Sequence, residues 1–166
     1  GAARMGLLRN NNRVYVKSRV LSKTYGQIVN KQFSSLLEMI DDYSLPFIKE
    51  NRYNVSDNVI ILKHCFYIYG KKGDSIDVDY KHIMNTRRLS KKSTKVCIPI
   101  YWSKNKNPKT INDGKKLCDL YIYWPNDDDS LRATVEVTFG ETMNVISYPT
   151  NMSDKRFETA VKYEWK

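Results

Sequence analysis

Apolar and polar positions alternate over several segments of the carboxyl-terminal half of the chain, and this alternation predicts strands. In 131–139 every second residue from Leu131 to Phe139 is apolar, and the residues between them are polar or charged. The segment 157–165 follows a similar pattern, and 143–148 is a shorter example. A period of two is what a strand with one buried face requires.

Further strands are predicted from alternation or from continuous apolar runs over 13–21, 59–69, 75–80, 95–102 and 117–124. The second and third of these are joined by the turn sequence GKKGD at 70–74, which predicts a hairpin. Another turn is predicted at 125–129. Pro99 cannot donate a ladder hydrogen bond, so the strand that contains it is expected at a sheet edge or at a bulge.

One segment has the period of a helix instead. Apolar residues from Val29 to Tyr43 fall on one face of a helix over roughly 27–43, with Thr24 as a cap and Pro46 beyond its end. The fold class predicted is therefore α+β and β-rich. It comprises one or more antiparallel sheets of about seven or eight strands and one main amphipathic helix near the amino terminus. Residues 1–12 are interpreted as a tag remnant and a basic arm, and 13–166 as a single globular domain.

Positive charge is unevenly distributed along the chain. The net charge is +10, and the segment 81–116 contains eleven Lys or Arg against one acid, Asp113. Residues 1–37 add seven Lys or Arg and no acid. Two basic loops, 81–95 and 103–116, are predicted to gather into one surface that binds phosphate-rich polyanions without base specificity. The candidate anion-binding residues are Lys81, Arg87, Arg88, Lys91, Lys92, Lys95, Lys104, Lys106, Lys109, Lys115 and Lys116.

Aromatic residues lie beside these basic loops. Tyr101 and Trp102 border the second loop, and a nearby strand carries Tyr121, Tyr123 and Trp124. Two interpretations are open: the rings stack on the bases of a single strand, or they build the core or an oligomer interface. The second is favoured, because Tyr and Trp are common at such interfaces.

Little in the chain points to catalysis. His64 is interpreted as a structural residue of an apolar strand, and His82 as a contributor to anion binding. Asp119, Glu136 and Lys162 offer a hypothetical metal-nuclease trio, and Asp127–Asp129 a hypothetical cation site, but consecutive acids in a turn are typically solvated. The cysteines, Cys65, Cys97 and Cys118, are expected to be buried structural thiols. No catalytic residue, metal, cofactor or small-molecule substrate is predicted, and the protein is expected not to be an enzyme.

Three segments carry a resemblance to a known family: 25–43 (YGQIVNKQFSSLLEMIDDY), 95–102 (KVCIPIYW) and 120–131 (LYIYWPNDDDSL). Together they resemble the globular domain of rhabdovirus matrix proteins. The resemblance implies a viral structural protein that self-associates and contacts ribonucleoprotein or RNA and anionic membrane through its basic loops. It implies a location in the virion and host cytoplasm, peripheral to the membrane. The Pro-rich late-domain motifs of that family are absent, so recruitment of budding factors is not implied.

Three alternatives remain open at this stage. A small viral capsid protein of jelly-roll type also needs about eight strands and a basic inner surface. A single-stranded nucleic-acid-binding protein and, last, a metal nuclease are the others. Neither secretion nor a transmembrane segment is expected, because there is no visible signal peptide and the apolar runs are short.

Overall fold

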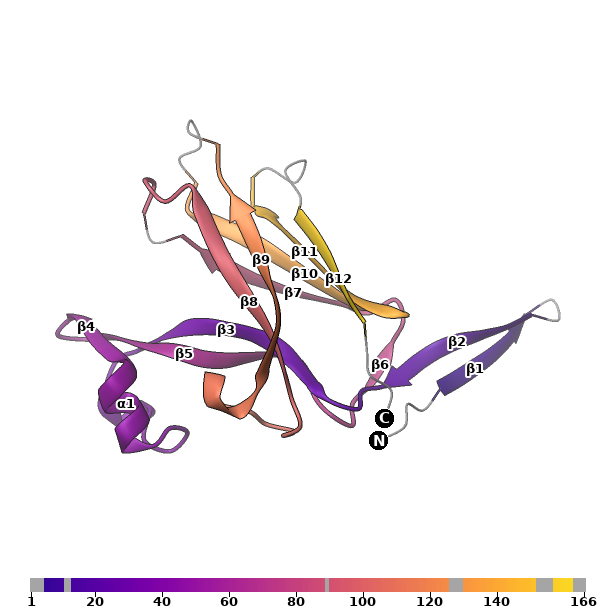
Figure 1. Cartoon of the computed structure of the whole chain (residues 1–166), viewed down its shortest axis with the longest axis horizontal. Coiled ribbons are helices and arrows are strands. Elements are labelled where there is room, and N and C mark those ends of the chain that lie inside the picture. Colours follow the sequence, from indigo (N-terminus) through magenta and orange to yellow (C-terminus); the bar gives the residue numbers. More distant parts are fainter. Residues whose placement is uncertain (1–4, 11–12, 89, 126–129, 152–156, 163–166) are drawn as a thin grey trace.

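The computed structural model describes residues 5–10, 13–88, 90–125, 130–151 and 157–162, which form three antiparallel sheets. Figure 1 shows a sandwich of strands above, a lobe carrying the helix at one side and a projecting hairpin at the other. The β-rich character predicted from alternation is thus confirmed. The described residues form twelve strands rather than seven or eight.

The largest sheet has five strands in the order β4-β5-β3-β8-β9. Their bounds are β3 Thr24–Phe33, β4 Arg52–Ser56, β5 Val59–Gly70, β8 Lys95–Ser103 and β9 Lys115–Tyr123. β3 and β5 are long, and they run from the lobe to a position beneath the sandwich (Figure 1). The predicted strands 59–69, 95–102 and 117–124 are confirmed as β5, β8 and β9.

The second sheet has four strands in the order β12-β11-β10-β7. Their bounds are β7 Lys81–Arg87, β10 Arg132–Phe139, β11 Thr142–Pro149 and β12 Phe157–Lys162. The predictions over 131–139, 143–148 and the first part of 157–165 are confirmed. Residues 81–87, predicted to be part of a loop, are instead an edge strand that pairs along its whole length with β10.

The third sheet, in the order β1-β2-β6, contains the projecting hairpin. Its strands are β1 Met5–Asn10, β2 Arg13–Val20 and β6 Ser75–Asp77. The strand predicted at 13–21 is confirmed, whereas the predicted pairing of 75–80 with 59–69 is wrong because β6 pairs with β2. The boundary placed at residue 12 falls inside the β1–β2 hairpin.

The helix predicted at 27–43 is wrong. The first part of that segment is β3, and it is followed by the one-turn 3-10 helix η1 (Leu36–Glu38). The helix α1 covers Leu45–Asn51, with Pro46 in its first turn and the Ser44 side chain accepting a hydrogen bond from the Phe47 amide. Pro46 therefore begins a helix instead of ending one, as its fixed φ allows at the first helical position.

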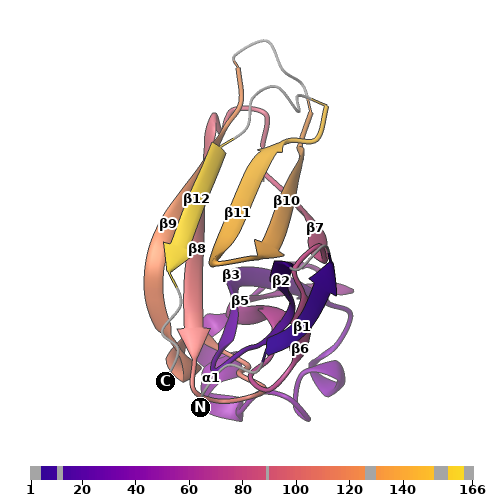
Figure 2. The same ribbon diagram turned by 90° about the vertical axis from the view of Figure 1, so that its right-hand side faces the viewer.

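Two apolar cores explain these elements. The main core lies between β8–β9 and the four-stranded sheet, and its fully buried residues include Ile100, Ile122, Val135 and Val137. Figure 2 shows these two layers side by side. A second core, with Met39, Phe47 and Leu62 among its members, joins α1 to the distal halves of β3 and β5. The helical period of 27–43 does not mark one buried face, because Val29, Phe33 and Tyr43 pack in this second core whereas Leu36, Leu37 and Ile40 are exposed.

Pro99 lies at a position of β8 where the sheet does not require a backbone N–H donor. β8 pairs with β9 on one side from Lys95 to Trp102, but its pairing with β3 ends at Ile100. A bulge follows between Ile100 and Tyr101. The strand is internal in the sheet, yet it has a local edge at Pro99, in line with the constraint that proline imposes.

No helix within the described ranges is long and apolar enough to cross a bilayer.

Candidate polyanion-binding surface

The two basic loops predicted from the sequence lie at opposite ends of the β8–β9 hairpin. Lys95 pairs with Tyr123 at one end and Trp102 with Lys115 at the other. At a rise of about 3.3 Å per residue, these ends are roughly 25 Å apart. Figure 1 shows one loop above the sandwich and the other below it. The expectation that both loops form one compact surface is therefore wrong.

Arg88, one of the predicted anion-binding residues, is buried. Its side chain is only 1% exposed. Nε donates to the Ser130 carbonyl at 2.9 Å and Nη1 to the Ser93 carbonyl at 2.9 Å, while the guanidinium lies 4.8 Å from the centroid of the Trp124 ring. This arrangement ties the loop after β7 to the connection before β10, so Arg88 cannot reach a ligand.

The other predicted cations of the segment 81–95 do not all lie at this end, because Lys81, at the start of β7, pairs with Thr138 at the far end of that strand. Lys81 lies 3.8 Å from the Glu136 carboxylate, and Lys95 Nζ lies 4.1 Å from the centroid of Tyr121. Arg87, Lys91 and Lys92 are exposed. The adjoining connection includes Asp127, Asp128 and Asp129, which lie outside the described residues.

The opposite end is more basic than the sequence predicted, because two other turns join the 103–107 turn there. The hydroxyl of Thr24, which is fully buried, donates to the Lys106 carbonyl at 3.1 Å and accepts from the Lys72 amide at 2.9 Å. The amide of Gly73 donates to the Leu21 carbonyl. Turns 21–24, 70–74 and 103–107 are thereby held together. We call the cations of these turns, together with Lys115 at the start of β9, the three-turn surface: Lys23, Lys71, Lys72, Lys104, Lys106 and Lys115.

Trp102 lies beside two lysines of the three-turn surface. Lys23 Nζ is 4.1 Å and Lys115 Nζ 5.8 Å from the centroid of its ring. A hollow of about 220 Å³ opens beside it, lined by residues that include Lys104, Asn105 and Asn112. The indole packs partly against the main core, which fixes the position of the ring. Attraction to the face of the ring keeps both ammonium groups close to it.

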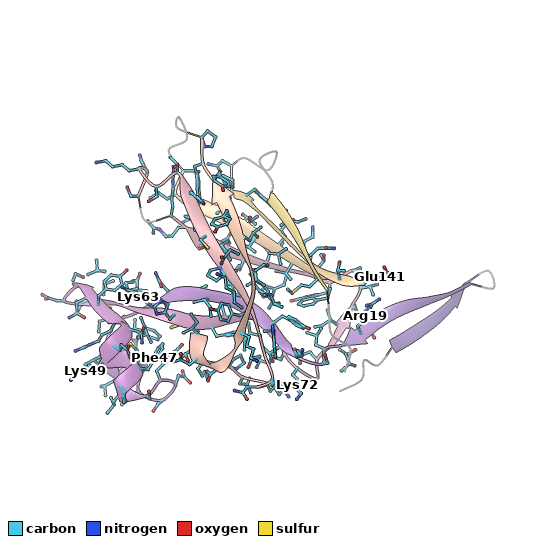
Figure 3. All side chains as sticks on the ribbon, viewed as in Figure 1. Arg19, Phe47, Lys49, Lys63, Lys72 and Glu141 are labelled. Carbon is cyan, nitrogen blue, oxygen red and sulfur yellow. The ribbon has the colours of Figure 1, made fainter. Side chains whose placement is uncertain are left out.

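Carboxylates around this end are already engaged. Asp113 accepts from the amides of Lys109 and Thr110, and Asp74 accepts from the amide of Lys71. Lys109 is 3.3 Å from Asp42. Among the described residues, Lys72, Lys104 and Lys106 take part in no ion pair. Their charge is therefore available to an outside anion. Figure 3 shows Lys72 below the crossing of β3 and β8, far from Lys49 and Lys63 on the lobe.

Sequence reasoning missed Lys23, Lys71 and Lys72. The two lysines of the GKKGD turn were a visible signal, but their partner turns are distant along the chain. Only the tertiary hydrogen bonds of Thr24 bring them to the β8–β9 loop.

The residues considered for catalysis are separated. Asp119 is on β9, where it binds Lys116 at 2.6 Å, and Glu136 is on β10, where it accepts from the Tyr148 hydroxyl. The side chain of Lys162 lies outside the described ones. His64 is exposed on a bulge of β5 and has a positive φ of 63°. Over the described ranges, no three His, Cys, Asp or Glu side chains gather into a metal-binding group.

The cysteines divide by position. Cys65 is buried, as expected, but Cys97 is exposed on the outer face of β8. Partial burial and a hydrogen bond to Asp119 raise the pKa of the Cys97 thiol. Cys97 is accordingly accessible but weakly ionised at neutral pH.

No protein-family model matches the chain, and no curated protein matches it.

Proposed function

We propose that this chain is a non-enzymatic structural protein of the viral matrix type that binds polyanions through the three-turn surface. The convergence of five lysines from three turns with Lys115 of β9, in turns joined by the Thr24 hydroxyl, is the observation that supports this role best. The partners are RNA of a nucleoprotein and anionic membrane, bound peripherally. A location in the virion and host cytoplasm follows from the same proposal.

The chemistry of the surface suits phosphate rather than particular bases. Ammonium groups on long side chains bind phosphate as point charges and need no fixed geometry. Each phosphate neutralised releases counterions, so affinity for RNA falls steeply with salt. The same charges attract anionic lipid, with about 1 kcal/mol for each lysine near the membrane surface.

The test is a salt series with single-stranded RNA and, separately, with vesicles containing phosphatidylserine. The double variant Lys72→Glu/Lys106→Glu is expected to weaken both interactions strongly and to reduce the log–log salt slope for RNA by about 1.4. The control is Lys49→Glu/Lys63→Glu, which makes the same charge change on the lobe and is expected to have a much smaller effect (Figure 3). If both variants lost binding affinity equally, binding would depend on net charge alone, and the proposal that this surface is the binding site would be wrong.

Self-association is part of the proposal and is assigned to the lobe. Leu37, Leu45 and Val55 are 74%, 69% and 62% exposed, and all residues of β4, an edge strand, are exposed. Apolar exposure on this scale marks an interaction site. Residues 34–58 contain five acids and two Lys or Arg, whereas 5–20 contain four Lys or Arg and no acid.

Opposite charge therefore favours a contact between the lobe of one copy and the β1–β2 hairpin of the next, at the other end of the molecule (Figure 1). A contact of this type is head-to-tail and propagates into chains of copies. The variant Leu37→Asp/Leu45→Asp is expected to shift sedimentation toward the monomer. Val78→Asp/Ile83→Asp, which changes exposed apolar residues elsewhere, should not. Monomeric behaviour of the unchanged protein at high concentration would contradict this part of the proposal.

The jelly-roll capsid alternative gains no support from the strand arrangement. That fold packs two sheets built from eight strands, whereas the described strands form sheets of five, four and three.

A further inference from the structure

We infer that the outer face of the β8–β9 hairpin is a second binding surface, which takes the unpaired nucleotides of a single-stranded nucleic acid. This inference deepens the proposed function and depends on it, since the three-turn surface at one end of the hairpin would hold the same strand by its phosphates. The outer face connects the two basic ends that the sequence led us to expect together.

Strand register places a defined set of side chains on this face. Val96, Ile98 and Ile100 of β8 belong to the core side, so the residues between them face outward. The cross-strand pairs are Lys95 with Tyr123, Cys97 with Tyr121, Pro99 with Asp119 and Tyr101 with Lys116. At the bulge between Ile100 and Tyr101, Leu117 is an extra residue of β9 without a partner on β8. Lys116 therefore pairs with Tyr101 and lies on the outer face.

Two tyrosines lie next to each other at the upper end of the face, one half-buried and one exposed. Tyr121 and Tyr123 have ring centroids 6.4 Å apart, and Tyr123 is 43% exposed. Lys95 Nζ lies 4.1 Å and 5.7 Å from the two centroids. Lys95 is itself exposed, so its ammonium contacts both rings at the surface of the hairpin, where a base could also stack.

The electrostatics of the face fit a strand of phosphates. Asp119 is the acid among the paired residues of the outer face, and Lys116 neutralises it at 2.6 Å. When a base stacks on the tyrosines, it displaces the Lys95 ammonium, which can then bind a phosphate of the same strand. Basic side chains then lie at both ends, with Lys91 and Lys92 above and the three-turn surface below.

A single strand fits these features better than a duplex does. In a duplex the bases are stacked on one another and their faces are not available to tyrosine. Aromatic side chains interleaved with basic ones bind single strands with little sequence preference, because every base offers a flat face. The wide spacing of the two basic ends suits an extended strand several nucleotides long.

The experiment compares binding of a fluorescent single-stranded RNA and of a duplex RNA with the same number of phosphates. Binding through phosphates alone favours the duplex, because its charge density is higher. We expect the unchanged protein to prefer the single strand. Tyr121→Val/Tyr123→Val, which keeps residues that favour strands, should weaken single-strand binding by about tenfold or more while leaving duplex binding and the salt slope unchanged.

Two further variants separate stacking from folding. Tyr121→Phe/Tyr123→Phe keeps the rings and is expected to bind the single strand like the unchanged protein. Tyr53→Val changes a tyrosine that is 36% exposed on β4 and should have no effect on either RNA. A loss of binding by the Phe variant as large as that of the Val variant would overturn the stacking role.

Cys97 supplies an independent readout, because it is exposed and pairs with Tyr121 in the middle of the face. Single-stranded RNA is expected to slow its alkylation by a maleimide severalfold, as measured by mass spectrometry, and duplex RNA should slow it much less. Equal protection by both RNAs, together with unchanged binding by the Val variant, would overturn the inference and leave the three-turn surface intact. If neither RNA nor anionic vesicles bind, the proposed function itself fails.

Discussion

Arg88 directly follows β7, and its guanidinium contacts two connections, the loop after β7 and the segment before β10. From the sequence it is one of a run of basic residues with Arg87, Lys91 and Lys92. Its burial and its hydrogen bonds to the Ser130 and Ser93 carbonyls give it a structural role that its neighbours lack. A side chain with five donors in a rigid fork can satisfy several carbonyls at once, which lysine cannot do in the same geometry.

Replacing Arg88 by Met is expected to lower the free energy of unfolding by about 2–4 kcal/mol, because it removes the charged donor to the Ser130 and Ser93 carbonyls and the contact with Trp124. Urea denaturation followed by tryptophan fluorescence measures this loss. Arg87→Met, at an exposed neighbouring position, is expected to change the free energy by less than about 0.5 kcal/mol. Similar effects of the two substitutions would show that the contacts of Arg88 do not stabilise the fold.

At the scale of elements, β3 shows how a strand can carry a helical pattern. Its burial pattern changes along its length, from four buried residues at the start to alternation at the end. The buried start lies against β5 and β8, where three strands meet closely. Gly26 allows this approach, since a Cβ there would lie within 3.0 Å of the Tyr67 carbonyl oxygen and of the Phe66 ring.

Gly26→Ala is expected to destabilise the protein by about 3 kcal/mol, because the carbonyl of a paired strand cannot move aside as a flexible side chain can. Thermal unfolding measured by circular dichroism checks this prediction. The matched control is Gly140→Ala, where the nearest atom to an added Cβ is 3.8 Å away and the change should be small. Tolerance of Ala at position 26 would contradict the close approach of β3 and β5.

At the scale of the whole molecule, His82 links two sheets. Its Nε2 lies 2.9 Å from the Tyr67 hydroxyl, so the contact joins β7 of the four-stranded sheet to β5 of the five-stranded sheet. The ring also lies close to Tyr69, whose hydroxyl donates to Gln27 on β3. Tyr80 is near Nδ1, and Lys81 and Glu136 form an ion pair on the adjoining strands. Burial lowers the pKa of His82 below its ordinary value of 6.5.

Because the folded protein binds this proton less readily than the unfolded chain does, stability is expected to fall as the pH drops through about 6.5 and below. His82→Gln should remove that part of the pH dependence. The check is the free energy of unfolding of both proteins between pH 7.5 and pH 5. Parallel curves for the two proteins over this range would contradict a contribution from His82.

Much of the secondary structure was predictable from the chain, and the pairing was not. Strands β5, β8, β9, β10 and β11 follow from local alternation or apolar runs, which reflect the period of two that burial imposes. The partner of β6 was not predictable, because its three residues are too short to specify a register. The helix prediction failed because the period of a segment does not show which of its apolar residues are buried: Leu37 and Ile40 are exposed, and Phe33 is part of a strand.

By itself, the sequence determined the β-rich class, most strand positions and a large excess of positive charge. The tertiary structure alone decided where that charge acts: it buried Arg88, placed the two basic loops at opposite ends of a hairpin and brought Lys23 and Lys72 to Lys106. The physical reason is that strand period and charge are properties of neighbouring residues. The meeting of turns about fifty and eighty residues apart depends on hydrogen bonds such as those of Thr24, which exist only after the sheets have packed.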